Sequence, residues 1–268
     1  MYNESVGYKV FKIFNYIFMV LLFPVYNRKN REIRPAEIDI FLTKDHLITI
    51  HYNQLEPLRN FFESCLKNKN ERDLYVSENP AMLLHEILER LYISLFPMTD
   101  HISEDINEIE KNIFTGKERE MVREILVVKR NIVYFRKIMQ FHRNILRNFI
   151  KIQLKMYGKH EPKIDTYYND LFDHVHAIWD ILENYQQTID ALEDTNTTQV
   201  SFKINDIMRT LTIFSVIVFP LTLLAAIFGM NVGGVPFAET ENAFLKIIGI
   251  MAMASIGMYS YFRYKKWI

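Results

Sequence analysis

Residues 211–230, LTIFSVIVFPLTLLAAIFGM, decide how this chain of 268 residues is organised, and NVGGVP at 231–236 follows them directly. A hydrocarbon layer of about 30 Å is crossed by roughly 20 helical residues. No residue between Arg209 and Glu239 carries a charge. We therefore predict a membrane-spanning helix over 211–230 that ends in a short polar mouth, which is typical of a pore entrance.

A second apolar run at 243–262 follows a short loop at 232–242, so the two runs predict a hairpin that crosses the membrane out and back. Lys203 and Arg209 precede the first span and the tail at 263–268 is basic, whereas the loop has no Lys or Arg. Lys and Arg are enriched on the cytoplasmic side of membrane helices. Both chain ends are therefore expected in the cytoplasm, and the loop outside the cell.

The residues before the hairpin predict a mixed domain. Runs rich in β-branched and aromatic residues at 13–23, 38–42 and 47–51 indicate strands, the last two joined as a hairpin. The first run is too short to span a membrane and has no small-residue cleavage site. A helix is expected from Pro80 to Phe96. We interpret residues 1–116 as a cytoplasmic α/β domain.

Two long helical patterns come next. Residues 117–157 contain no Pro or Gly and repeat apolar residues every three or four positions, apart from a gap near His142. This predicts one long amphipathic helix within a cytoplasmic segment at 117–166. A helix seam then alternates steps of four and three: Leu171, Val175, Ile178, Leu182, Tyr185, Ile189 and Leu192. We predict a single stalk helix over 167–231 that continues into the first span.

Composition excludes several classes of protein. The chain has 32 basic and 32 acidic residues, so its net charge gives no reason to expect nucleic acid as a partner. One cysteine, Cys65, excludes an internal disulfide framework and a thiolate zinc cluster within one protomer. No nucleophile with its base, phosphate-binding glycine loop or paired metal ligands is present, so we expect neither an enzyme nor a prosthetic group.

Charge is unevenly distributed along the two long helical segments. Residues 111–160 hold 13 Lys or Arg against three Asp or Glu, and residues 161–200 hold nine Asp or Glu against one Lys. Two readings of this imbalance are open. The opposite charges complement each other where the segments pack, or the acidic helix binds cations.

The first span carries a mixed face. Polar and apolar residues recur there at three- and four-residue spacing: Asn205, Met208, Leu211, Thr212, Ser215, Phe219, Thr222 and Ala226. A face that alternates hydroxyl, amide and apolar groups suits an intermittently wetted conduit. Alternatively, its hydroxyl groups only satisfy carbonyls of their own helix, as is common in membranes.

These motifs together resemble the CorA superfamily of divalent-cation transporters. The resemblance is carried by NDIMRTLTI at 205–213, FPLT at 219–222, FGMN at 228–231 and KKWI at 265–268. Weaker similarity extends over nearly the whole chain. VGGVP at 232–236 is similar to the ZntB-like branch, which is associated with zinc. Relatives usually carry tens of residues more before the first strand, so the resemblance implies an N-terminally shortened domain.

The resemblance implies an α+β funnel domain, a very long stalk helix and a two-span hairpin, assembled as a homopentamer in the cell inner membrane. The first membrane helix would line a central pore and the second would face lipid. Gly229, Met230 and Asn231 would form the selectivity filter, with the mixed face lining the conduit below it and Leu211 and Met208 at its apolar gate. A ring of Asn231 amides suits hydrated Mg²⁺, which gives up water reluctantly.

The resemblance also implies feedback by the transported ion. Asp170 and Asp194 fall where relatives place carboxylates that contact regulatory cations between protomers, so cytoplasmic Mg²⁺ would close the pore. The function expected is Mg²⁺ uptake, with Co²⁺ or Ni²⁺ as further ions. A proton-coupled Zn²⁺ transporter and a membrane-anchored scaffold that moves no ion are the alternatives.

Overall fold

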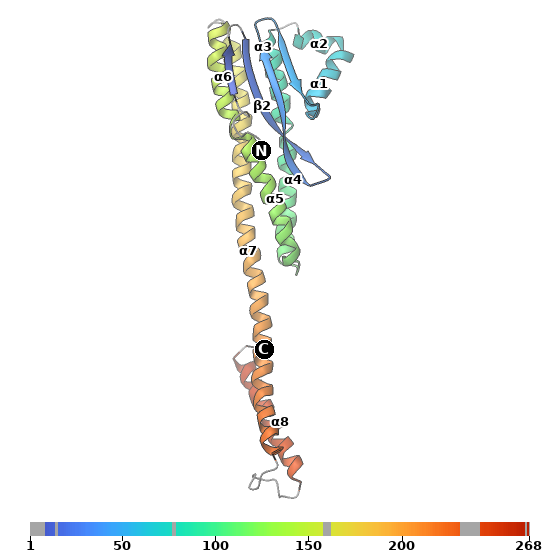
Figure 1. Cartoon of the computed structure of the whole chain (residues 1–268), viewed down its shortest axis with the longest axis vertical. Coiled ribbons are helices and arrows are strands. Elements are labelled where there is room, and N and C mark those ends of the chain that lie inside the picture. Colours follow the sequence, from blue (N-terminus) through green and yellow to red (C-terminus); the bar gives the residue numbers. More distant parts are fainter. Residues whose placement is uncertain are drawn as a thin grey trace. The chain divides into compact units, whose positions relative to one another are not determined.

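The computed structural model describes residues 9–13, 16–76, 79–157, 162–230, 242–265 and 267. The chain folds as two compact units, Met1–Asn196 and Thr197–Ile268. The strands are β1 (Lys9–Ile13), β2 (Tyr16–Asn27), β3 (Glu32–Leu42) and β4 (Leu47–His51). The helices are α1 (Glu56–Lys67), α2 (Lys69–Val76), α3 (Pro80–Ile93), α4 (Phe96–Ile113), α5 (Glu118–Met139), α6 (His142–Tyr157), α7 (Pro162–Phe228) and α8 (Ala243–Tyr264) (Figure 1).

The first unit is built on an antiparallel sheet in the order β1-β2-β3-β4. Of the apolar run predicted as one strand over 13–23, Ile13 ends β1 and residues 16–23 lie in β2, whereas residues 14 and 15 are outside the described residues. The register sets buried residues opposite one another: Ile17 with Leu42, Met19 with Ile40, and Leu21 with Ile38. Because every strand pair is antiparallel, the unit is α+β, and the looser α/β description of residues 1–116 does not apply.

Helices cover the buried face of this sheet. α5 lies against β2 and β3, α6 against β1 and β2, and α3 against β4. Large aromatic side chains fill the space between them, among them Phe23, Tyr92, Phe135 and Phe149, all fully buried. The helices at 118–157 therefore share one hydrophobic core with the strands.

The long helix predicted over 117–157 is in fact two helices, because α5 ends at Met139 and α6 begins at His142. The His142 ring is fully buried at this joint. Its Nε2 donates to the carbonyl of Leu22 at 2.8 Å, and its Nδ1 accepts from the hydroxyl of Tyr92 at 2.9 Å. Burial lowers the pKa of His142 to about 4, so the ring is neutral. The gap in apolar spacing near His142 therefore marks the break between α5 and α6. At this break the His142 ring links α6 to β2 and α3 by hydrogen bonds.

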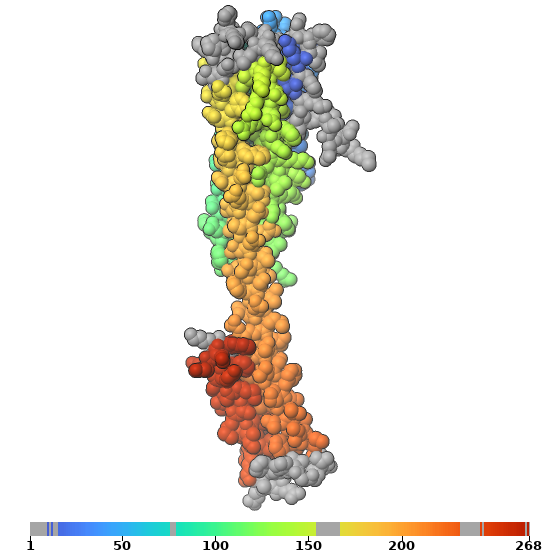
Figure 2. All heavy atoms as spheres, turned by 90° about the vertical axis from the view of Figure 1, so that its left-hand side faces the viewer, coloured from blue at the N-terminus to red at the C-terminus, as the bar shows by residue number. Residues whose placement is uncertain are grey.

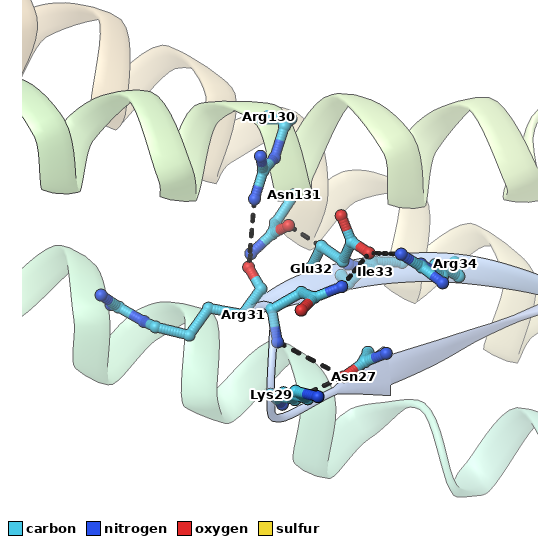
Figure 3. Close-up of polar contacts among 9 residues, drawn as sticks. Asn27, Lys29, Arg31, Glu32, Ile33, Arg34, Arg130 and Asn131 are labelled. Atoms are coloured by element: carbon cyan, nitrogen blue, oxygen red, sulfur yellow. Dashed lines mark hydrogen bonds and ion pairs between the residues drawn. The ribbon is translucent and has the colours of Figure 1, made fainter.

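The turn between β2 and β3 is fixed to α5 by a small polar cluster (Figure 3). Asn131, on α5, accepts from the amide of Ile33 at 3.2 Å and donates to the carbonyl of Arg31 at 3.1 Å. Arg130 donates to the same carbonyl at 3.3 Å. Within the turn, Asn27 accepts from the amide of Lys29 at 3.0 Å. A buried amide with two backbone partners anchors the hairpin against the helix.

The predicted seam of α7 is buried in the first unit. Leu171, Ile178, Leu182 and Ile189 are fully buried, and Val175 is nearly so. Asn196 is the last buried residue on this stretch of α7, and its side chain donates to the carbonyl of Glu118 at 3.0 Å. The heptad-like spacing thus identified the side of α7 that packs against the rest of the unit.

The second unit consists of the C-terminal part of α7 and of α8. Both helices are long and apolar enough to cross a membrane. α8 runs beside α7 in both views (Figures 1 and 2). The buried or half-buried residues of α7 that repeat on one side are Ile213, Ile217, Pro220, Leu221, Leu224 and Phe228. Those of α8 are Ile247, Met251, Ala254, Ser255, Met258 and Phe262. These two stripes form the hairpin contact.

Candidate ion-conduction face

The eight residues predicted to line a pore occupy one side of α7. They are exposed, except for the half-buried Ser215. Successive helical residues turn by about 100°, so this side points away from the stripe that contacts α8. Phe219 on the predicted face is 71% exposed, whereas Ile213 in the stripe is 9% exposed. Nothing else in the described part of this unit covers the predicted face.

The hydroxyl groups on this face share one bonding pattern. Thr212 donates to the carbonyl of Met208 at 2.7 Å, Ser215 to that of Leu211 at 2.9 Å, and Thr222 to that of Val218 at 2.9 Å. These are the carbonyl bonds that the alternative interpretation expects. A hydroxyl has one proton and two lone pairs. Because the proton is used inside the helix, each oxygen offers only acceptor capacity to its surroundings.

Such a face fits a hydrated cation. Water bound to a metal through its oxygen directs its O–H groups outward, where they need acceptors. Mg²⁺ in particular keeps several waters. The hydroxyl oxygens of Ser215 and Thr222 can therefore accept from the hydration shell without displacing it.

An apolar section precedes the hydroxyl groups along α7. Met208 is 55% exposed and Leu211 is 57% exposed. Neither packs in the hairpin contact, so both side chains are free to meet other chains or water. Rings of such side chains exclude water when they approach one another.

Only part of the predicted filter lies within the described residues. α7 ends at Phe228, and the amide of Gly229 still donates to the carbonyl of Ala225 at 2.9 Å. A Cβ on Gly229 would stand 3.1 Å from that carbonyl oxygen, closer than most side chains tolerate. The glycine thus permits a tight helix end directly before Met230. Asn231 and the loop that follows it lie outside the described residues.

The two predicted regulatory residues are not brought together within the chain. Asp170 and Asp194 are both exposed on α7. Their separation of 24 positions (194 − 170) along one helix corresponds to about 36 Å. Among the described residues no group of three His, Cys, Asp or Glu side chains is placed to hold a metal. A cation at either Asp would need ligands from elsewhere.

Pairing between the basic and acidic helices is present at particular residues. Lys129 on α5 lies 2.8 Å from a carboxylate oxygen of Asp190 and 2.5 Å from one of Glu193. Hydrogen bonding to Lys129 holds the pKa of Asp190 below its usual value. Arg136 lies over the ring of Trp179, 5.0 Å from its centroid. The opposite charge blocks indicated such contacts, but their partners could not be read from the sequence.

A family model described as CorA-like Mg²⁺ transporter protein matches residues 3–266. The chain belongs to this family. It is 26% identical over 259 residues to the cobalt/magnesium transport protein CorA of Thermotoga maritima, covering 95% of this chain and 71% of the relative. It is 25% identical over 246 residues to the putative metal ion transporter YfjQ of Bacillus subtilis, covering 91% and 75%.

A solved CorA structure shows the same fold. The complete CorA magnesium transporter from Methanocaldococcus jannaschii superposes with a TM-score of 0.81 at 20% identity, covering 98% of this chain and 80% of that one. The predicted fold class of a sheet-containing domain, a very long helix and a second apolar helix is thereby confirmed. The resemblance to the CorA family seen in the sequence is confirmed as well.

Proposed function

We propose that this chain assembles with copies of itself into a divalent-cation channel that takes Mg²⁺ up across the cell inner membrane, with both chain ends in the cytoplasm. The CorA-like family, the named transport proteins among its relatives and the two apolar helices support this proposal. The basic flanks at Arg209 and Arg263 support the orientation. Co²⁺, which is in the name of the Thermotoga relative, is a second candidate ion.

The observation that carries the proposal is that the face of α7 predicted to line a pore offers hydrogen-bond acceptors. We call this side of α7, which includes Thr212, Ser215 and Thr222, the acceptor face. α8 packs against the opposite stripe, so this face is available to line a space shared with other copies. Thr222 and Ser215 direct oxygen lone pairs outward because their protons are bonded to helix carbonyls. A ring of such oxygens stabilises a hydrated cation inside an otherwise apolar membrane, where an unsolvated charge is very unfavourable.

We assign the outer filter to Gly229, Met230 and Asn231, and the gate to Met208 and Leu211. A ring of neutral Asn oxygens holds a hydrated ion weakly enough for it to leave. Rings of Met208 and Leu211 would repel water when the copies lie close together. Entry of the cation is driven by the membrane potential, at about 2.3 kcal/mol per elementary charge for 100 mV.

Regulation is assigned to Asp170 and Asp194, each bridged by cytoplasmic Mg²⁺ to a neighbouring copy. Bound Mg²⁺ would favour the closed state, and its loss would leave carboxylates that repel one another. The double variant Asp170→Asn with Asp194→Asn should therefore need more cytoplasmic Mg²⁺ for inhibition. Glu183→Gln, on an exposed position of the same helix, is the matched control. Unchanged inhibition in the double variant would remove both residues from this role.

Ion flux into liposomes that contain the full-length protein tests the function itself. Wild-type protein should admit Mg²⁺ without a proton gradient, and Asn231→Ala should alter both the rate and the preference among Mg²⁺, Co²⁺ and Zn²⁺. Zn²⁺ flux that requires a pH gradient would instead support proton-coupled zinc transport, the alternative suggested by VGGVP at 232–236. Absence of any flux would support a scaffold that moves no ion.

A further inference from the structure

A groove of about 510 Å³ lies between α6 and α7 in the first unit. Figure 2 shows the two helices side by side on the face turned to the viewer. Charged and polar side chains from both helices form its walls: Arg143, Arg147 and Lys151 from α6, and Asn169, Asp173 and His176 from α7. Ile150 and Phe172 supply its apolar part.

The three cations of α6 form a ridge of exposed positive charge. They recur at every fourth position, so they lie on one side of the helix over about 12 Å. All three are exposed, and their side chains make no ion pair or hydrogen bond with the described residues. The cations of α5 differ, since Lys129 is bonded to two carboxylates of α7 and Arg136 covers Trp179. Within the described part of the chain, the ridge therefore lacks the kind of partners that the cations of α5 have.

We propose that this groove binds a nucleoside polyphosphate. A polyphosphate chain is an extended row of negative charge, which matches a row of three cations. The guanidinium groups of Arg143 and Arg147 can each bind phosphate oxygens in a bidentate manner. The volume falls within the usual range for small-molecule sites.

The remaining lining residues suit the nucleoside part. The ring of Phe172 is half-buried and can stack with a base, and Ile150 extends the same apolar surface. The carboxylate of Asp173 can accept from ribose hydroxyl groups, and the Asn169 amide can pair with a base edge. A row of cations alone would bind any polyanion, so the ring of Phe172 is what selects a nucleotide over inorganic phosphate.

This inference depends on the proposed function only for placing the groove in the cytoplasm, where nucleotides are found. A nucleoside triphosphate also binds Mg²⁺ through its phosphates. The site would thus bring a Mg²⁺ ligand to the transporter itself. Binding can be measured without transport, so a failed binding test leaves the proposed channel untouched, and a failed flux test leaves the groove untouched.

Calorimetric titration of the full-length protein in detergent with ATP, in the presence of a chelator, tests the proposal. Arg147→Gln and Arg143→Gln should each weaken ATP binding about tenfold, the effect of losing roughly one charge-assisted contact pair. Arg123→Gln, which removes an exposed cation of α5 that has no ion pair with the described residues, should leave ATP binding unchanged. Phe172→Leu should weaken binding of ATP but not of inorganic triphosphate.

Four results would overturn the assignment. Equal affinities for ATP and inorganic triphosphate, both insensitive to Phe172→Leu, would reduce the groove to a site for phosphate alone. ATP binding that is unchanged in both arginine variants would place the nucleotide elsewhere on the protein, and a wild-type protein that binds no ATP would exclude the site. A smaller assembly by light scattering in Arg147→Gln, with unchanged ATP affinity, would identify the ridge as a contact between copies of the chain.

Discussion

The hydroxyl groups of α7 are compatible with both interpretations of the sequence pattern, a wetted face and bonds to carbonyls of the same helix. The residues concerned are Thr212, Ser215 and Thr222. Their hydroxyl protons satisfy carbonyls of α7, at 2.7 to 2.9 Å. The same bonds leave the oxygens able only to accept. Internal bonding and exposure toward a wetted space are therefore compatible, and the first produces the chemistry that the second needs.

Thr222→Val tests this role because valine keeps the shape of the side chain and removes the oxygen. The loss of one acceptor for the hydration shell should slow Mg²⁺ flux roughly fivefold, the equivalent of about 1 kcal/mol. Ser255→Ala is the matched control, since Ser255 makes the same kind of bond, to the carbonyl of Met251 at 2.9 Å, on the α7-facing side of α8. Equal flux in all three proteins would exclude hydroxyl oxygens from the conduction path.

His142 predicts a pH dependence of stability. Its pKa is about 4 in the fold and about 6.5 in an unfolded chain, so the unfolded state takes up the proton first. The contribution is complete above about pH 6.5 and falls as the pH decreases toward 4, by roughly 3 kcal/mol in total. Chemical unfolding followed by circular dichroism should show this slope in wild type and a shallower one in His142→Phe. Identical slopes would contradict the assignment.

At the scale of elements, the buried seam of α7 joins this helix to the core of the first unit. Ile178 is fully buried among other apolar side chains. Ile178→Ala should therefore lower the free energy of unfolding by about 2–5 kcal/mol. Leu126→Ala, at a position on α5 that is 55% exposed, should change it by less than about 0.5 kcal/mol. Similar losses in the two variants, measured by urea titration, would mean that the seam does not stabilise the unit.

Elements defined by local periodicity could be predicted from the sequence. β3, β4 and α7 follow patterns of two or of three and four residues, which depend only on neighbouring positions. The break between α5 and α6 could not be predicted, because it depends on bonds from His142 to Tyr92 and Leu22, which are 50 and 120 positions away. The anchoring of the β2–β3 turn by Asn131 depends likewise on a distant contact, since Ile33 lies 98 positions away.

The candidate ion-conduction face could likewise be predicted from the sequence only in part. Spacing alone placed Ser215, Phe219 and Thr222 on one side of a helix. It could not show that α8 covers the opposite side, because that depends on how Ile213 and its stripe pack in three dimensions. The carbonyl to which each hydroxyl group donates its proton likewise depends on the folded helix and could not be predicted from spacing. The roles of Asn231, Asp170 and Asp194 rest on resemblance to the family and stay predictions.

At the scale of the whole molecule, α7 leaves much apolar surface uncovered by the described residues of its own chain. Every residue from 201 to 212 is exposed, among them large apolar side chains such as Phe202 at 57% and Ile207 at 67%. Exposed apolar surface of this extent marks an interaction site. Beyond 212 the hairpin covers one side of α7 only. Further copies of the chain, arranged around the acceptor face, would cover the rest and enclose a conduit.

The most direct test of this conduit is the water accessibility of single cysteines in α7. In a Cys65→Ser background, Thr222→Cys should react with a charged thiol reagent, and the reaction should abolish Mg²⁺ flux into liposomes. Leu224→Cys, in the stripe that faces α8, should remain unmodified and conduct. Modification of Leu224→Cys with loss of flux, while Thr222→Cys stays inert, would show that the opposite face of α7 lines the path and would contradict the account.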